Sequence, residues 1–127
     1  MKKVNYISDL HFEHVAWNNE LSLQRDELKT FQHRLEEVAP RYSNTDVLSK
    51  VEQYQNKFIR HFEVIDTLQH EVNEHESHLV NFAKNHPIAI DHVHFKDHTG
   101  IRDKVESQLN IYKDLKKNFL RFLTQTM

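Results

Sequence analysis

Apolar residues recur at a seven-residue spacing along most of this chain of 127 residues. In residues 7–38, two positions three residues apart hold mainly apolar side chains, and residues 47–82 repeat the arrangement. A third series of this kind runs from Ile101 to Phe122. This spacing places the apolar side chains on one stripe of an α-helix. A strict repeat of seven further predicts long, coiled-coil-like helices that supercoil with a left hand.

The helical pattern is interrupted at only a few residues. The chain has one Gly, two Pro and no Cys, so it lacks the turns that a β-sandwich or a doubly wound sheet needs. Pro40 and Pro87 each interrupt a helix, because proline cannot continue one. We predict one all-α domain over residues 1–127, with helices at about 4–39, 45–85 and 101–126 and a capping segment at 86–100.

The three apolar stripes match one another when the helices are placed as antiparallel neighbours. Trp17 then lies opposite Leu68 and Val105, and nearly every other layer is apolar on all three helices. Agreement between independent stripes is expected of a chain that encodes one structure. The sequence therefore predicts an antiparallel up-down-up three-helix bundle. A short extra segment or dimerisation would complete a four-helix arrangement.

The predicted capping segment, residues 86–100, does not continue the third stripe. It fits a helix in a shifted register, a short extended piece or an ordered loop. Its apolar residues have no place in the predicted core, so we expect them to form the contact of a homodimer. These residues are Ile88, Ile90, Val93 and Phe95.

The composition narrows the classes of function. Charges of both signs are interspersed and the formal net charge is -2, so no nucleic-acid partner is expected. No apolar stretch is long enough to span a bilayer or to serve as a signal peptide, which favours a cytoplasmic location. A glycine-rich phosphate loop is also missing. The sequence favours a non-catalytic interaction or scaffold protein that self-associates.

One polar layer interrupts the middle of the predicted core. Gln24, His61 and Tyr112 fall in it together. A buried polar group without a partner costs roughly 2–7 kcal/mol by transfer estimates, and these three side chains can bond with one another. We expect a closed, hydrogen-bonded layer that fixes the register of the helices.

A second polar layer lies near one end and uses several of the chain's 11 His. His75 and His98 are predicted to face each other, with His14 one layer away. Imidazoles and carboxylates from facing helices are the ligands by which bundles hold Zn, Fe or Mn. The alternative function is therefore a metal-binding bundle, and a pH-sensing cluster is a further interpretation. The predicted ligands are His14, Glu71, His75, His94 and His98, with His11, Glu74, His78 and Asp97 as alternates or as acceptors for ring N–H groups.

The histidine spacing resembles parts of the pattern of hemerythrin-like proteins. That pattern has a His, a His-x-x-x-Glu, a His-x-x-x-His and a late His-x-x-x-x-Asp across four helices. The resemblance implies non-haem iron and redox or oxygen chemistry in a helical bundle, as an analogy of architecture. His98 would have to serve twice, and three long helices stand in place of four. The counterparts here are His14, His70 with Glu74, His94 with His98, and His98 with Asp103.

Overall fold

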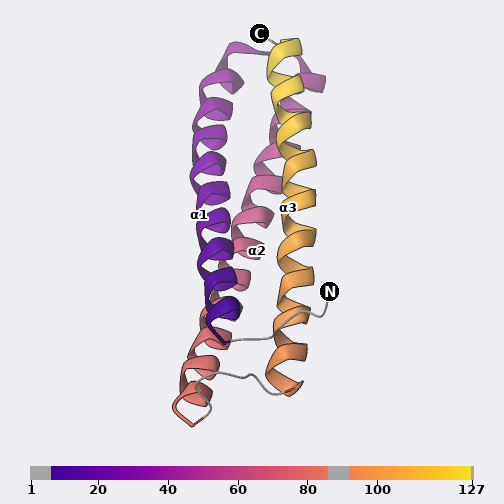
Figure 1. The fold of residues 1–127 in the computed structure, drawn as a ribbon. Helices are drawn as coiled ribbons and strands as arrows, with labels where there is room; N and C mark the ends of the chain where they lie inside the picture. Colours follow the sequence, from indigo (N-terminus) through magenta and orange to yellow (C-terminus); the bar gives the residue numbers. More distant parts are fainter. Residues whose placement is uncertain (1–6, 86–91, 127) are drawn as a thin grey trace.

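The computed structural model describes residues 7–85 and 92–126, and of residues 92–95 it describes only the path of the helix. The three α-helices of these residues lie side by side along one axis, with α2 running opposite to α1 and α3 (Figure 1). The predicted all-α, up-down-up three-helix bundle is confirmed. The helices are α1 (Ile7–Val38), α2 (Thr45–Ala83) and α3 (His92–Thr126), and a short 3-10 turn, η1 (Ala39–Arg41), follows α1.

The core is densest at the end of the bundle that holds η1. Four aromatic side chains from all three helices pack there, and the ring centroids of Phe58 and Phe119 lie 5.0 Å apart. Phe31 and Tyr54 complete the group, at 5.2 and 5.3 Å from the Phe119 ring. Removing one buried aromatic ring from such a core costs about 3–5 kcal/mol. This end therefore supplies much of the stability through aromatic and apolar packing.

A smaller apolar cluster lies farther from η1. It contains Trp17, Val72 and Val105, one residue from each helix, all buried. Leu68, which was predicted to lie opposite Trp17 and Val105, is also buried in the adjoining cluster. The predicted register of α2 against α3 is confirmed, because His75 and His98 face each other. The predicted height of α1 was wrong by about one helical turn, because His14 shares the layer of His75 and His98 and was expected one layer away.

Helix α3 begins at His92, not at Ile101 as the apolar pattern predicted. Residues 92–100 are its first turns, because His98 continues the buried stripe seven residues before Val105. A search for apolar periodicity missed this turn because its core residue is polar. The remainder of the predicted capping segment, residues 86–91, lies outside the described residues.

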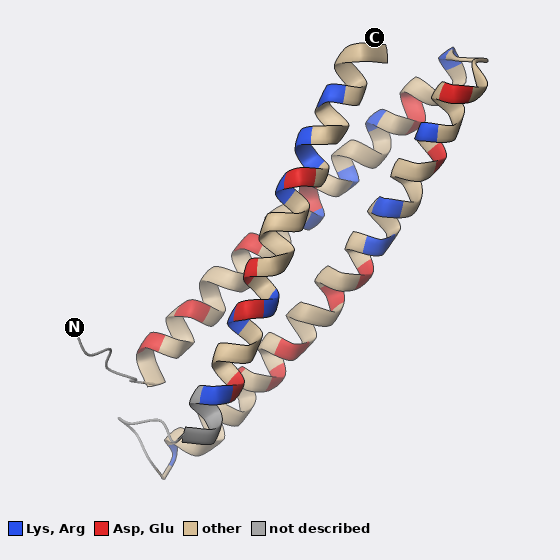
Figure 2. Cartoon of the chain, turned by 90° about the vertical axis from the view of Figure 1, so that its right-hand side faces the viewer, with Lys and Arg blue, Asp and Glu red and all other residues tan. Residues whose placement is uncertain are grey.

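Charged residues of both signs are distributed along all the helices (Figure 2). Some of them pair between helices: Lys104 Nζ lies 3.1 Å from Glu71, and Lys116 Nζ lies 2.7 Å from Glu27. Exposed pairs of this kind each contribute about 0–1 kcal/mol. Within residues 7–85 and 92–126, no helix is both long enough and apolar enough to cross a membrane.

Candidate metal centre

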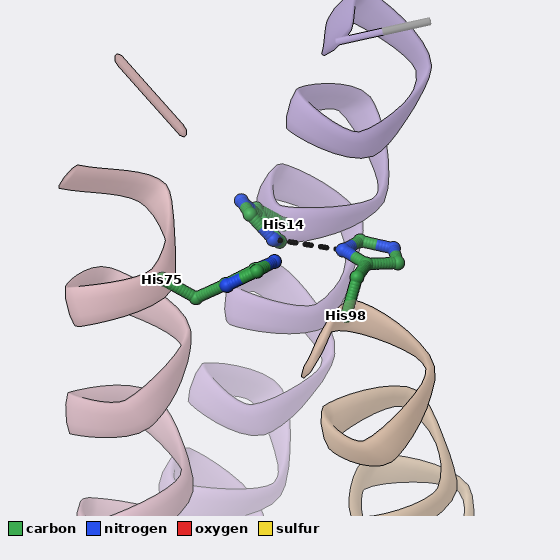
Figure 3. A group of neighbouring side chains, drawn as sticks. All are labelled: His14, His75 and His98. Atoms are coloured by element: carbon green, nitrogen blue, oxygen red, sulfur yellow. Dashed lines mark hydrogen bonds between the residues drawn. The ribbon is translucent and has the colours of Figure 1, made fainter. Parts of the chain in front are cut away.

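Three buried histidines, one from each helix, meet near the end of the bundle opposite η1 (Figure 3). His14 comes from α1, His75 from α2 and His98 from α3, and their exposed fractions are 2%, 4% and 0%. They are brought together because each occupies a core position of its helix, at matching heights in the antiparallel register. One ring nitrogen from each can be chosen such that all three lie within 4.8 Å of one another. We call this group the histidine layer.

The rings of the histidine layer are in mutual contact. The His14 ring centroid lies 5.1 Å from that of His75 and 5.0 Å from that of His98, and the His75 and His98 centroids are 5.4 Å apart. Trp17 stacks on His98, with centroids 4.7 Å apart and planes at 30°. The indole therefore separates the histidine layer from the apolar core beyond it.

Two carboxylates hold the outward nitrogens of these rings. The His14 Nδ1–H group donates to Glu76 Oε1 over 2.7 Å, and the His98 Nε2–H group donates to Glu13 Oε1 over 3.0 Å. A carboxylate on one ring nitrogen fixes the tautomer, so the other nitrogen carries a lone pair. Both carboxylates therefore prepare their imidazoles to act as ligands toward the interior.

The inward nitrogens of His14 and His98 face each other across the core. His14 Nε2 lies 3.2 Å from His98 Nδ1, along the dashed line of Figure 3. Two lone pairs at this distance repel each other unless a positive charge lies between them. A shared proton is one such charge and a metal cation is another. Two nitrogens bound to a tetrahedral Zn²⁺ lie about 3.3 Å apart, given Zn–N bonds of about 2.0–2.1 Å.

The surroundings favour charged carboxylates and a neutral imidazole. Burial opposes ionisation of Glu76, but hydrogen bonds from His14 and His11 hold the pKa of Glu76 below its ordinary 4.5. Burial likewise opposes ionisation of Glu13, and its pKa is also lowered, here by Arg102 and then His98. For His98, burial is the largest influence and lowers the pKa below 6.5, outweighing the bond to Glu13. A proton on His98 is thus disfavoured near neutral pH.

The two carboxylates differ in their outer partners. Arg102 donates from Nε to Glu13 Oε2 over 3.0 Å and from Nη2 to Glu13 Oε1 over 2.5 Å. Glu76 Oε2 instead accepts from Nδ1 of His11, over 2.5 Å, and the His11 side chain is 59% exposed. The guanidinium neutralises Glu13, whereas Glu76 faces an imidazole in contact with solvent.

The structure brings together three of the five predicted ligands, His14, His75 and His98. Glu71 lies on the side of α2 that faces α3, where it pairs with Lys104. The side chain of His94 lies outside the described residues. Of the four alternates, His11 reaches the layer through Glu76, whereas the remaining three, Glu74, His78 and Asp97, are exposed.

Sequence reasoning missed Glu13, Glu76 and Arg102 as parts of this site. Glu13 immediately precedes His14, and Glu76 immediately follows His75. Each lies at the edge of its helix's core stripe, on the side that faces a neighbouring helix. The signal that would have found them is an acidic residue at an edge position directly beside a core histidine.

The mid-bundle polar layer has a different membership from the one predicted. Gln108 Nε2 lies 3.2 Å from Gln24 Oε1 and 3.0 Å from His61 Nδ1, and all three residues are buried. Tyr112, the predicted third member, donates its hydroxyl to Glu27 over 2.7 Å. Gln24 meets Gln108, one turn before Tyr112, because α1 lies about one turn from its predicted height, and the Tyr112 ring centroid stays 6.1 Å from that of His61. We call Gln24, His61 and Gln108 the glutamine layer.

The other sequence-based prediction concerned a dimer. Its contact was expected to be formed by Ile88, Ile90, Val93 and Phe95. The first two lie outside the described residues, and the side chains of the other two are not described, so self-association stays a prediction.

A groove of about 600 Å³ lies between α2 and α3, with Val64, Leu68 and Ile111 among its apolar lining. None of the three histidines of the histidine layer lines it.

Comparisons of the chain with protein-family models, with curated proteins and with solved structures gave no match.

Proposed function

We propose that this chain is a metal-binding helical bundle that holds one divalent transition-metal ion in the histidine layer. The favoured ion is Zn²⁺. His14 Nε2, His98 Nδ1 and one ring nitrogen of His75 are the ligands. Glu76 and Glu13 accept the outer N–H groups of His14 and His98. Such carboxylate partners orient the ring and raise its basicity as a ligand.

The observation that carries this proposal is the 3.2 Å approach of two inward-facing imidazole nitrogens whose outer nitrogens are both held by carboxylates. Because burial lowers the pKa of His98, a shared proton is a poor source of the positive charge that the pair requires. A metal cation supplies that charge at any pH at which the rings are neutral. It also binds imidazole nitrogen, which the third buried ring, His75, supplies.

The ligand set favours zinc over iron. Imidazole nitrogen suits Zn²⁺, Cu²⁺, Ni²⁺ and iron, but the 2-His-1-carboxylate sites of non-haem iron oxygenases add a directly bound carboxylate. Here both carboxylates face the outer side of the rings, so the ion would meet nitrogen alone. The hemerythrin-like arrangement of carboxylate-bound iron is therefore the weaker expectation.

The role of the ion is structural. All three ligands are at least 96% buried, and each comes from a different helix. An ion bound to them joins α1, α2 and α3 at the end of the bundle that lacks the aromatic core. Binding to the folded chain alone then stabilises it by mass action.

The test is zinc titration of tag-free protein after removal of metal with a chelator. Calorimetry should show one ion per chain, and elemental analysis of protein dialysed against buffer should show that ion retained. His75→Gln should weaken binding at least about tenfold, while His33→Gln, which changes an exposed histidine at the other end of α1, should leave it unchanged. An ion that fails to bind, or one that binds equally to both variants, would refute the proposal.

A further inference from the structure

The histidine layer is closed, so an ion must reach it from the surface through a defined path. Its rings are at most 4% exposed, and transfer of a bare divalent ion into such an interior is prohibitively costly. An ion therefore has to exchange its waters for protein ligands one at a time. The groups able to begin this exchange are those that contact the layer and also reach solvent.

Among the side chains that the structure describes, two carboxylates meet this description, and one of the two is open to a cation. Glu13 is 31% exposed, but Arg102 covers both its oxygens, and its positive charge repels an incoming ion. Glu76 is 25% exposed, and the group on its outer oxygen is the imidazole of His11. The positive charge of Arg102 thus closes the path past Glu13, whereas the path past Glu76 begins at the surface with a second potential ligand, His11.

The surface around His11 and Glu76 attracts cations. The flanking stretches of α1 and α2, residues 7–21 and 69–83, contain no Lys or Arg. Figure 2 shows the corresponding stretch of α1, next to the N label, with acidic bands alone. A surface of one sign raises the local concentration of the opposite ion. The acidic residues of these stretches are Asp9, Glu13, Glu20, Glu71, Glu74 and Glu76.

Building on the proposed metal-binding function, we propose that His11 and Glu76 form the entry site of the histidine layer. The ion first binds the exposed His11 ring and the outer oxygen of Glu76, in place of the hydrogen bond between them. His14 lies three residues after His11 on the same face of α1, and His75 immediately precedes Glu76. The next ligands are therefore within one helical turn, and the ion passes to them as it loses its remaining waters.

The experiment measures the rates of Co²⁺ uptake and release with metal-free, full-length protein. Bound Co²⁺ is detected by its visible absorption after rapid mixing, and release is followed by adding excess chelator. In His11→Gln, the amide keeps a hydrogen bond to Glu76 but is a poor metal ligand. An entry site speeds both the binding and the release of the ion. In His11→Gln, the rates of uptake and release should therefore each fall about tenfold, because the passing ion loses one ligand. The equilibrium Kd should not change.

His70→Gln is the matched control. His70 and Glu74 form a second exposed His–Glu pair on α2, with nitrogen and oxygen 3.7 Å apart, and neither belongs to the histidine layer. This variant should take up Co²⁺ at the rate of the unmodified chain. If His11→Gln takes up Co²⁺ at the rate of the unmodified chain, whether or not its Kd is weaker, the proposed entry site is wrong and the proposed metal-binding function still stands. Failure of the unmodified chain to bind Co²⁺ would overturn the proposed function with it.

Discussion

The two polar layers of this core have the same plan and opposite chemistry. Each takes one buried polar side chain from each helix, and each interrupts a stripe that is otherwise apolar. In the glutamine layer, Gln108 lies within hydrogen-bond distance of Gln24 and His61, so the polar groups are directed at one another. In the histidine layer, His14 and His98 donate outward to carboxylates, and their inward nitrogens face each other.

The difference shows where to look for a ligand site in a helical core. Buried polarity alone does not distinguish the two layers, since both contain buried histidine. What distinguishes them is the direction in which the N–H groups are used. In the glutamine layer the Gln108 amide donates within the layer, although Gln24 Nε2 has no partner there, whereas donation to carboxylates outside the histidine layer leaves lone pairs inside that a cation can bind.

The largest expected difference between the layers is their response to zinc. At a free Zn²⁺ concentration a thousand times the Kd, the unmodified chain should gain about 4 kcal/mol in its free energy of unfolding. Replacing His14, His75 and His98 together by Leu should abolish that gain, because the ligands are gone. Urea unfolding with and without Zn²⁺ measures it.

The same replacement in the glutamine layer is the control for that measurement. A chain with Gln24, His61 and Gln108 all changed to Leu should keep the full gain from zinc. Loss of the zinc response in this variant would mean that the two layers do not act separately.

A second, smaller effect should come from breaking the glutamine layer in half. Gln108→Leu removes the shared partner of Gln24 and His61 and leaves two buried polar groups without it, at about 1–3 kcal/mol each. The free energy of unfolding should fall by about 3 kcal/mol, measured by urea denaturation of metal-free protein. The Kd for Zn²⁺ should be unchanged, because the layers are about 15 Å apart along α1. A parallel loss of zinc affinity would contradict this separation.

The carboxylates give a third effect, on affinity. Glu76→Gln should raise the Kd for Zn²⁺ about tenfold, because the amide is a weaker acceptor for the His14 ring and carries no charge. Glu27→Gln is the matched change beside the glutamine layer, where Glu27 accepts from Tyr112 and Lys116. It should leave the Kd unaltered in the same calorimetric titration. Equal Kd values for the two variants would show that the outward hydrogen bond of His14 does not support a ligand.

The smallest effect concerns pH and belongs to the glutamine layer. Burial lowers the pKa of His61 below 6.5, so between 6.5 and that lower value the unfolded chain binds a proton that the folded chain does not. Stability is therefore complete above pH 6.5 and falls as the pH drops through the folded pKa. His61→Gln in the chain with a leucine-filled histidine layer should flatten urea-derived stability between pH 7.5 and 5.5. An unchanged slope would assign the loss to other histidines.

The apolar stripes allowed the fold and the three buried histidines to be predicted, because core positions follow from helical geometry alone. His75 and His98 were expected to face each other, and they do, but His14 was expected one layer away and lies in the same layer. The partners of these rings could not be predicted in the same way. Glu71 was chosen because it lies four residues before His75, but it faces α3 and meets Lys104, whereas Glu76 faces α1. Which edge residue reaches a ring depends on the rotation of each helix, which periodicity does not specify.

The predicted start of α3, at about residue 101, was wrong for a different reason. Its stripe continues through His98, and a histidine at a core position looks like the end of an apolar pattern. A histidine in a helical core therefore weakens the apolar pattern by which the helix is predicted. The choice of Gln108 over Tyr112 also lay beyond the sequence, since both occupy core positions of α3 and the height of α1 along the bundle decides which of them Gln24 meets.

An odd number of antiparallel helices leaves Ile7 and Thr126 at opposite ends of the rod (Figure 1). A pull applied through these ends would slide α1 past α3 along the long axis, so all lateral contacts would be loaded at once. The histidine layer joins both sliding helices, and α2 between them, close to the point where force enters α1. Bound zinc would thus oppose the sliding of α1 past α3, and the zinc-bound molecule would extend only under a higher force than the zinc-free molecule.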